Sequence, residues 1–298
     1  MTRERELRLG ILGLSDGNGH PYSWSAIFNG YDPAVMAECP FPVIPQYLAR
    51  QVFPRDAILG ARVTHIWTQD NEAARHVARA TRIPRVVSDP EAMLGEVDAV
   101  LLARDDAENH RDMARPFLLN GLPIYIDKPV ALTVDDLERM LAMQQKPGQL
   151  FSCSALRWAR EFNLALHCNE IGQIRHIQAT TPKCWSKYAV HLLDPILEQL
   201  GLFATPAEVT RVSDIPEVVH VRWPDITATI TCTGALPSDI RMRVFGNGGS
   251  RDLIFLNTFA AFRDALLRFV ATARGTSLGT TSNELRALVR ILESGLAR

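Results

Sequence analysis

Apolar positions in the first half of the chain form short runs, separated by stretches in which they recur every three or four residues. The runs lie at 7–12, 63–68, 86–87, 99–102, 124–126 and 150–155 and predict strands. The stretches between them, at 22–29, 72–81, 90–94, 110–120 and 134–144, predict helices. Because strands that alternate with helices form parallel sheets covered on both faces, this order predicts a doubly wound α/β sheet of the Rossmann type.

After about residue 155 the pattern changes to the two-residue alternation that is typical of antiparallel strands. Alternating segments lie at 174–180, 207–212, 218–223, 226–233 and 242–245, and helical segments at 260–272 and 282–296 close the chain. We therefore expect a dinucleotide-binding type of domain over residues 1–155. An α+β domain with a mostly antiparallel open sheet is expected over residues 156–298, for substrate binding and oligomerisation.

The segment between the first predicted helix and the second predicted strand is longer than a strand–helix–strand unit needs. It has about 30 residues, whereas such connections usually have two to six. It contains the sequence Cys-Pro-Phe-Pro-Val-Ile-Pro at 39–45. We interpret residues 30–57 as an insertion with a short helix at 46–52, and its role does not follow from the sequence.

The charge composition and the N-terminal segment argue against a nucleic-acid-binding protein and a membrane protein. Lys and Arg together number 32 and Asp and Glu 33, giving a net charge of -1, so there is no basic excess to neutralise a nucleic acid backbone. The apolar run that follows the charged N-terminal residues is too short for a signal peptide or a membrane span. We expect a cytoplasmic protein that binds neither nucleic acid nor membrane.

Cysteines and histidines show no metal-binding spacing. The five cysteines are scattered without a C-x-x-C pair, and the histidines form neither H-x-x-x-H nor H-E-x-x-H. We therefore expect reduced thiols and no metal site. Chemistry in this protein would then use an organic cofactor or side chains alone.

A glycine-rich segment joins the first predicted strand to the first predicted helix, where backbone N–H groups can approach a pyrophosphate. A G-x-G-x-x-G motif counted from Gly13 would need glycine at Ser15 and Asn18, and Asp16 adds a carboxylate that would repel phosphate. A simple strand-to-helix turn is the alternative. The candidate cofactor-binding residues of this segment are Gly13, Ser15, Asp16, Gly17, Asn18, Gly19 and His20.

His20 precedes Pro21, which suits the first turn of a helix, so His20 either contacts phosphate or caps the helix. At the end of the second predicted strand, Thr68 stands where an acid commonly binds the adenosine ribose. Asp70 either binds the ribose in its place or serves as the N-cap of the following helix. The cofactor is therefore expected to be NAD or NADP, without a choice between them.

A further set of residues carries a family resemblance. The run Asp-Ala-Val-Leu-Leu at 98–102 is followed by His110, by Gly121 eleven residues later, and by Asp127-Lys128-Pro129. This spacing resembles the family of glucose-fructose oxidoreductase, inositol dehydrogenase and the rhizopine-catabolism proteins (Gfo/Idh/MocA), whose motif is Glu-Lys-Pro. The resemblance implies an NAD(P)-dependent oxidoreductase in which Lys128 polarises a substrate oxygen and lies, like Asp127, beside the cofactor. For His110 we expect helix capping or packing.

Four polar residues at 187–194 form the second candidate cluster. If the segment is helical, Lys187, Tyr188, His191 and Asp194 share one stripe. The resembling family has a G-x-x-x-D-x-x-x-H element whose histidine acts as acid or base, and His191 stands at that position. The aspartate of that element falls at Lys187 and its glycine at Lys183, so Tyr188 is a candidate substitute acid.

Asp194 has a structural alternative, because Pro195 follows it. Proline suits the first turn of a helix, so Asp194 could be the N-cap of a helix over 195–200. The catalytic candidates are thus Lys128, His191, Tyr188, Lys187 and Asp194, with Lys187 or Tyr188 holding neighbouring hydroxyl groups.

We expect hydride transfer to or from a hydroxyl-bearing small molecule, a sugar, amino sugar or nucleotide-linked sugar by the family resemblance. The alternatives are a catalytically inactive sensor or assembly protein on a dinucleotide fold, and an imine or enone reductase. In the second domain Val219, Val221 and Trp223 alternate with more polar positions, which leaves an apolar sheet face to cover. Because resembling enzymes assemble through such a face, we expect a homodimer or homotetramer.

Overall fold

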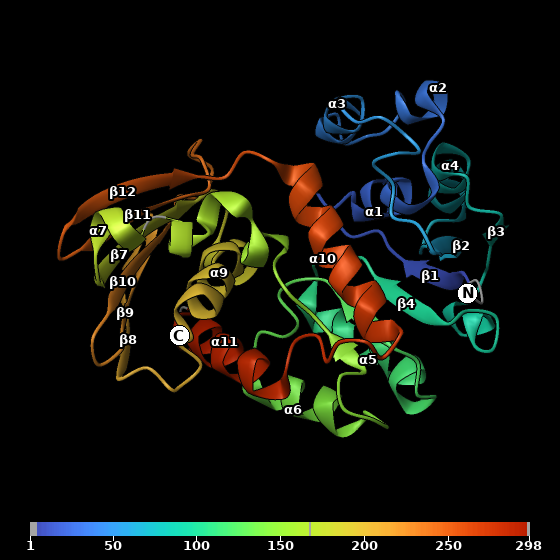
Figure 1. The fold of residues 1–298 in the computed structure, drawn as a ribbon. Helices are drawn as coiled ribbons and strands as arrows, with labels where there is room; N and C mark the ends of the chain where they lie inside the picture. The colour runs from blue at the N-terminus through green and yellow to red at the C-terminus, as the bar shows by residue number, and fades with distance from the viewer. Residues whose placement is uncertain (1–4, 167, 297–298) are drawn as a thin grey trace. The chain divides into compact units, whose positions relative to one another are not determined.

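The computed structural model describes residues 5–166 and 168–296, and its contacts divide the chain into two compact units (Figure 1). Unit 1 comprises the chain up to Asp127 together with Arg139–Ser152 and Phe262–Thr281. Unit 2 comprises Lys128–Glu138, Cys153–Ala261 and the residues from Ser282 onwards. The division between domains after residue 155 stays a prediction, and the chain passes from unit 1 to unit 2 between Ser152 and Cys153.

Unit 1 contains a six-stranded parallel sheet. Its strands are β1 (Leu7–Leu12), β2 (Ala61–Trp67), β3 (Arg85–Val86), β4 (Ala99–Leu102), β5 (Ile124–Ile126) and β6 (Leu150–Phe151). They are ordered β3-β2-β1-β4-β5-β6, which confirms the predicted doubly wound arrangement. The last strand is shorter than the predicted 150–155, because Ser154 accepts a hydrogen bond from the Leu156 N–H and caps the 3-10 helix η2 (Ala155–Trp158).

Helices flank this sheet on both faces (Figure 1). The helical segments up to residue 142 are α1 (His20–Asn29), α2 (Pro33–Met36), α3 (Val43–Leu48), α4 (Asn71–Thr81), η1 (Pro90–Met93), α5 (Ala107–Leu119) and α6 (Val134–Ala142). Helices α1 and α4 lie on one face and α5 lies on the other. Because β4 and β5 are buried along their whole length, their sequences are continuous apolar runs, as expected for central parallel strands.

The insertion packs on the start of α1. Its helix α3 begins three residues before the predicted 46–52, with Pro45 in the first turn, where the missing N–H breaks no hydrogen bond. A Cβ at Gly19 would lie 2.4 Å from the Phe41 ring and 2.7 Å from Ile44 Cδ1. Gly19 is therefore required for the close approach of the insertion to α1.

Unit 2 contains a second six-stranded sheet. Its strands are β7 (Ile174–Thr181), β8 (Glu208–Asp214), β9 (Glu217–Arg222), β10 (Thr227–Cys232), β11 (Arg241–Gly246) and β12 (Gly249–Ile254), in the order β12-β11-β7-β10-β9-β8. Only the β7–β10 pair is parallel. Strand β12 was not predicted, because it lies at the sheet edge and Leu253 is its only buried residue, which leaves no apolar alternation.

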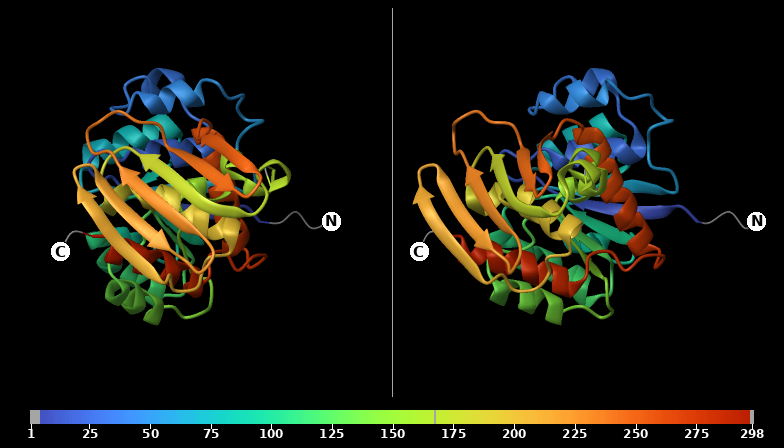
Figure 2. Two further views of the ribbon diagram at one scale, coloured as in Figure 1. Left: turned by 90° about the vertical axis from the view of Figure 1, so that its left-hand side faces the viewer. Right: turned by 60° about the vertical axis from the view of Figure 1, so that its left-hand side comes forward.

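Helical segments complete both units. They are η2, η3 (Arg160–Phe162), η4 (Leu164–Leu166), α7 (Cys168–Ile171), α8 (Trp185–Tyr188), α9 (Val190–Leu200), α10 (Thr258–Ala273) and α11 (Ser282–Ser294). Helix α9 lies against one face of the unit 2 sheet, whose other face is turned toward the viewer in the left view of Figure 2.

The predicted alternation on β9 is correct, but its apolar face is not left uncovered. Val219, Val221 and Trp223 are at most 2% exposed within the chain, so they do not need a partner subunit. His220 and Arg222 lie on the more exposed face. A homodimer or homotetramer stays a prediction, and contacts through this sheet would use its polar outer face.

Candidate functional site

The glycine-rich turn is hydrogen-bonded to residues that follow two strands of the unit 1 sheet. Ser15 Oγ donates a hydrogen bond of 2.8 Å to Asp105 Oδ1, just after β4, and accepts one of 3.1 Å from the Asp105 N–H. Asn18 Nδ2 donates a hydrogen bond of 2.9 Å to Asp127 Oδ2, just after β5. Ser15 and Asn18, the two departures from the glycine motif, thus hold the turn against the carboxyl ends of the strands, where parallel sheets bind ligands.

The tip of this turn presents backbone donors. The Asn18 N–H donates to the Ser15 carbonyl at 3.0 Å, and Gly17 has a φ of 71°, a left-handed conformation that favours glycine. Asp16 and Gly17 are exposed, and no group in the described parts of the chain accepts a hydrogen bond from their N–H groups. A Cβ at Gly17 would have no atom within 4 Å. These two residues can therefore hold a phosphate group, whereas Gly13 and Gly19 are packed against protein atoms.

His20 does not cap α1, contrary to one of the two predicted roles. It is the first helical residue, and Gly19 occupies the N-cap position. The His20 N–H donates to Asn18 Oδ1 at 2.8 Å, and its Nδ1 lies 2.6 Å from Asp127 Oδ2. The ring stacks on Trp24 at 4.9 Å between centroids. Asp127 thus orients His20, and the contact of His20 with phosphate stays a prediction.

The structure decides the role of Asp70. Its carboxylate accepts hydrogen bonds from the N–H groups of Glu72 at 2.8 Å and Ala73 at 3.3 Å, so it is the N-cap of α4. Thr68 Oγ1 donates to the Asp70 carbonyl. Both residues are therefore engaged within their own loop.

Sequence reasoning missed two residues at the same sheet edge. Gln69 Nε2 donates to the Leu14 carbonyl at 2.7 Å, and Arg104 Nη1 donates to Gln69 Oε1 at 2.9 Å. Their position directly after β2 and β4 was the available signal. His110 lies on α5, is fully buried and places Nε2 2.9 Å from the Arg104 carbonyl, which confirms its packing role.

Three of the predicted catalytic residues come together in unit 2. Lys128 is 4% exposed, and its Nζ lies 5.2 Å from the centroid of the Tyr188 ring. The ring centroids of Tyr188 and His191 are 4.9 Å apart. Lys183, which was considered only as the position of a missing glycine, places its Nζ 4.5 Å from the same Tyr188 centroid. Lys187 lies half-buried on α8 beside Tyr188.

Ser154 links His191 to Asp194. His191 is 9% exposed, and its Nδ1 lies 2.9 Å from Ser154 Oγ. The Ser154 N–H donates to Asp194 Oδ2 at 2.7 Å, and Ser154 Oγ accepts from the Leu156 N–H at 3.1 Å. These bonds hold the Ser154 hydroxyl in place against the imidazole, so Ser154 and Asp194 act on His191 as positioning residues.

The predicted N-cap role of Asp194 is wrong. Helix α9 begins at Val190, and Pro195 lies inside it. Leu192 and Leu193 are fully buried, so their burial outweighs the interior proline, which costs about 3 kcal/mol. Asp194 therefore lies in mid-helix with an exposure of 1%.

Arg157 pairs with Asp194 and with two further carboxylates. Its guanidinium lies 2.8 Å from Asp194 Oδ1, 2.5 Å from Glu198 Oε2 and 2.8 Å from Glu284 Oε2. Burial alone would lower the pKa of Arg157, but the three carboxylates raise it above its ordinary value. Ser154 and Arg157 were not predicted as site residues, because their partners lie far away in sequence.

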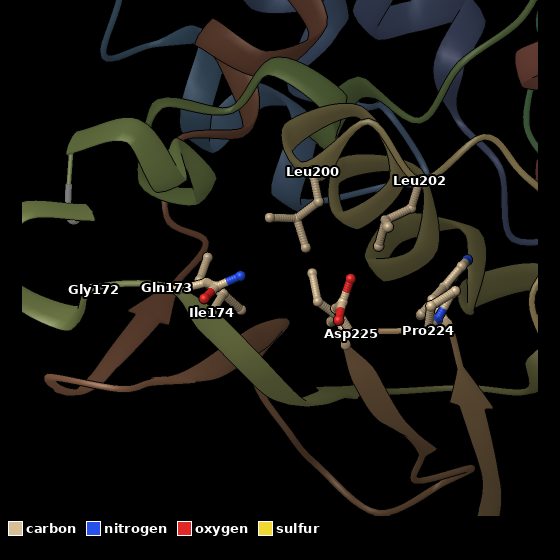
Figure 3. A pocket seen from close by; sticks show the side chains of 9 residues that line it. Gly172, Gln173, Ile174, Leu200, Leu202, Pro224 and Asp225 are labelled. Carbon is tan, nitrogen blue, oxygen red and sulfur yellow. The ribbon is translucent and has the colours of Figure 1, made fainter.

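An apolar cleft in unit 2 lies apart from these groups (Figure 3). Leu200 and Leu202 face Ile174 and Asp225 across it. Its described lining contains no lysine or histidine. Asp225 is the one ionisable side chain in that lining.

Among the residues that the structure describes, no group of three or more His, Cys, Asp or Glu side chains could hold a metal ion. No helix in residues 5–166 or 168–296 is long and apolar enough to cross a membrane.

Part of the chain is similar to a known protein family. Residues 46–154 match the sequence profile of the GFO_IDH_MocA oxidoreductase family, NAD-binding Rossmann fold. Over 95 residues, 31% of this chain and 28% of the relative, the sequence is 33% identical to inositol 2-dehydrogenase 2 of Saccharopolyspora erythraea. The chain thus matches less than a third of the length of that relative.

Solved structures share the fold over nearly the whole chain. The scyllo-inositol dehydrogenase of Lactobacillus casei superposes with a TM-score of 0.72 at 12% identity, covering 98% of this chain and 96% of that one. GenD2 from gentamicin A biosynthesis, solved in complex with NAD, superposes with a TM-score of 0.72 at 15% identity over 97% and 93% of the two chains. Residues 46–154 are thus similar to the NAD-binding Rossmann fold of the Gfo/Idh/MocA oxidoreductases, and the solved structures show that the whole chain shares the fold of such dehydrogenases.

Proposed function

We propose that this protein is an NAD(P)-dependent oxidoreductase that transfers hydride to or from a hydroxyl-bearing small molecule of the sugar class. The cluster of Lys128, Tyr188 and His191 carries this proposal. In it, an ammonium group and an imidazole, which are suited to alkoxide stabilisation and proton transfer, both lie against one phenol ring. Lys128 follows directly on Asp127, the last residue of the first segment of unit 1.

The residues that would hold the cofactor lie in the glycine-rich turn. The free N–H groups of Asp16 and Gly17 would bind its pyrophosphate, while Ser15 and Asn18 keep the turn at the strand ends. When bound, the nicotinamide ring accepts or donates the hydride. Because Thr68 and Asp70 are engaged in their own loop, we assign the ribose to neither of them.

Residues of unit 2 would carry out the proton transfer. In the direction of oxidation, His191 takes the proton of the reacting hydroxyl, and the ammonium of Lys128 stabilises the negative charge that develops on its oxygen. Ser154 holds the imidazole in place at 2.9 Å, and Asp194 holds Ser154. Tyr188, in contact with both side chains, is suited to bind a neighbouring hydroxyl group.

The names of similar proteins support the sugar class of substrate. The relative that is 33% identical over 95 residues is named inositol 2-dehydrogenase 2, and the superposed structures include a scyllo-inositol dehydrogenase. Both names describe proteins that act on a ring carrying several hydroxyl groups.

Cofactor binding tests the proposal directly. We expect NADH or NADPH to bind the intact protein saturably below millimolar concentration, because the turn offers two unpaired backbone donors. The measurement is a titration that follows the fluorescence of the reduced nicotinamide. Absence of saturable binding of both dinucleotides up to millimolar concentration would contradict the proposed function.

Replacing Gly17 by valine is expected to weaken cofactor binding about tenfold and to leave the protein folded. The new side chain has open space but must adopt a φ of 71°, which costs about 1–2 kcal/mol. It also stands beside the N–H groups that would bind phosphate. Cofactor affinity and melting temperature are measured together.

Gly121→Val is the matched control, because Gly121 also has a left-handed φ, 75°, and open space around its Cβ position. It should lower the melting temperature to a similar extent without changing cofactor affinity. If Gly17→Val binds as tightly as Gly121→Val, the turn does not hold the cofactor.

A further inference from the structure

Lysine is rare in this chain, and most of its lysines lie near Tyr188. Of the 32 lysines and arginines only four are lysine, at 128, 146, 183 and 187. Lys128 and Lys183 both lie against the Tyr188 ring, and Lys187 lies beside Tyr188 on α8. Lysine is a compact point charge, whereas arginine is a planar fork suited to fixed ion pairs. Most of the compact, flexible cationic side chains of this protein therefore lie at the candidate site.

The backbone of Lys183 gives an independent indication that its side chain has a role. Its φ is 60°, a left-handed conformation that residues with a Cβ rarely adopt. Reciprocal hydrogen bonds with Gly234, of 2.9 and 3.0 Å, hold it there. The other such residue among those described, Arg82, ends helix α4, where this conformation is common. Lys183 is not at the end of a helix; it directly precedes Cys184, the N-cap of α8.

The charges around Tyr188 favour an anion. Lys128 is buried and Lys183 is exposed, so Lys183 is the cation of this pair that is open to solvent. Two carboxylates near this segment are already engaged, Asp194 with Arg157, and Glu217 with Arg211 and the Trp185 N–H. Lys128 and Lys183 place two ammonium groups against one ring, and this positive charge favours a negatively charged ligand beside it.

We infer that Lys183 is a specificity-determining residue, and that the substrate carries an anionic group, a carboxylate or a phosphate, which binds Lys183. This inference rests on the proposed function, in which Lys128 faces the reacting hydroxyl. The Lys183 ammonium lies 4.5 Å from the centroid of the same ring that the Lys128 ammonium approaches to 5.2 Å, so both cations border the Tyr188 side chain. The substrate class is thus a sugar acid or a sugar phosphate.

The experiment is a calorimetric titration of the full chain at low salt with D-glucuronate, D-glucose 6-phosphate and neutral D-glucose. We expect at least one anionic probe to bind more tightly than glucose, and Lys183→Gln to weaken its binding about tenfold. Lys183→Arg should keep the affinity within about threefold, because it keeps the charge. Lys146→Gln removes the one lysine outside the cluster and should change nothing.

Equal affinity of the wild type and Lys183→Gln for the anionic probes, or no preference of the wild type for either over glucose, would overturn the inference. The two probes distinguish a carboxylate from a phosphate. If Lys183→Gln weakens NADH or NADPH binding to the same extent, the anion belongs to the cofactor and the substrate assignment is wrong. Loss of probe binding in Lys183→Gln, without dinucleotide binding to the wild type, would instead refute the proposed function and leave the anion site standing.

Discussion

Lys128→Met is expected to lower kcat/KM by about 10²- to 10³-fold, the loss typical for removal of one group that stabilises a developing oxyanion. Methionine has similar length without the charge, and Lys128 is only 4% exposed, so an apolar replacement suits its surroundings. The ammonium is the group that we place at the reacting oxygen, and its removal acts on the transition state. The measurement is the rate of NAD(P)H formation with the sugar-class substrate that the wild type oxidises fastest.

Lys146→Met provides the control for this prediction, because Lys146 is exposed and lies outside the cluster. It should retain the activity of the wild type. Lys128→Met activity within about threefold of that control would show that Lys128 is not at the reacting oxygen.

Arg157→Met is expected to lower the free energy of unfolding by about 3–5 kcal/mol, since it leaves the buried carboxylate of Asp194 and two partly buried ones without their counter-charge. Asp194 is 1% exposed and ion-paired at 2.8 Å, and Glu198 and Glu284 share the same guanidinium. The raised pKa of Arg157 keeps this cation charged throughout the working pH range. Urea unfolding followed by circular dichroism measures the change.

Arg222→Met is the matched control, because Arg222 forms a 2.9 Å ion pair with Glu208 in which both side chains are about half exposed. An exposed pair contributes about 0–1 kcal/mol, so this variant should remain near the wild type. A loss in Arg157→Met no larger than in Arg222→Met would contradict a stabilising role for the buried network. Adding Asp194→Asn to Arg157→Met should recover part of the stability, since it removes one uncompensated charge.

Local patterns predicted the candidate residues of unit 2, but not their arrangement. Lys128, Tyr188 and His191 were expected from spacing and resemblance, and their rings and charges do meet. Ser154 and Arg157 escaped prediction, because Ser154 is 37 residues from His191 and Arg157 is 127 residues from Glu284. A pattern of neighbouring positions contains no information on contacts of that separation.

The sequence by itself determined the parallel sheet of unit 1, since its central strands must be apolar on both faces and its helices must show a helical period. It also determined the alternation on β9 and the N-cap at Asp70 as one of two possibilities. These features depend on interactions between residues close together in the chain.

Where the sequence allowed two local structures for a residue, only the tertiary structure decided which one forms. Pro195 favours a helix start, yet α9 begins at Val190, because burial of its apolar residues in unit 2 outweighs the lost hydrogen bond. His20 could cap a helix, but Asp127, 107 residues away, binds its ring. The left-handed backbone of Lys183 likewise follows from its hydrogen bonds to Gly234 on a distant loop. Such choices depend on the free energy of the whole packed unit, which local sequence does not contain.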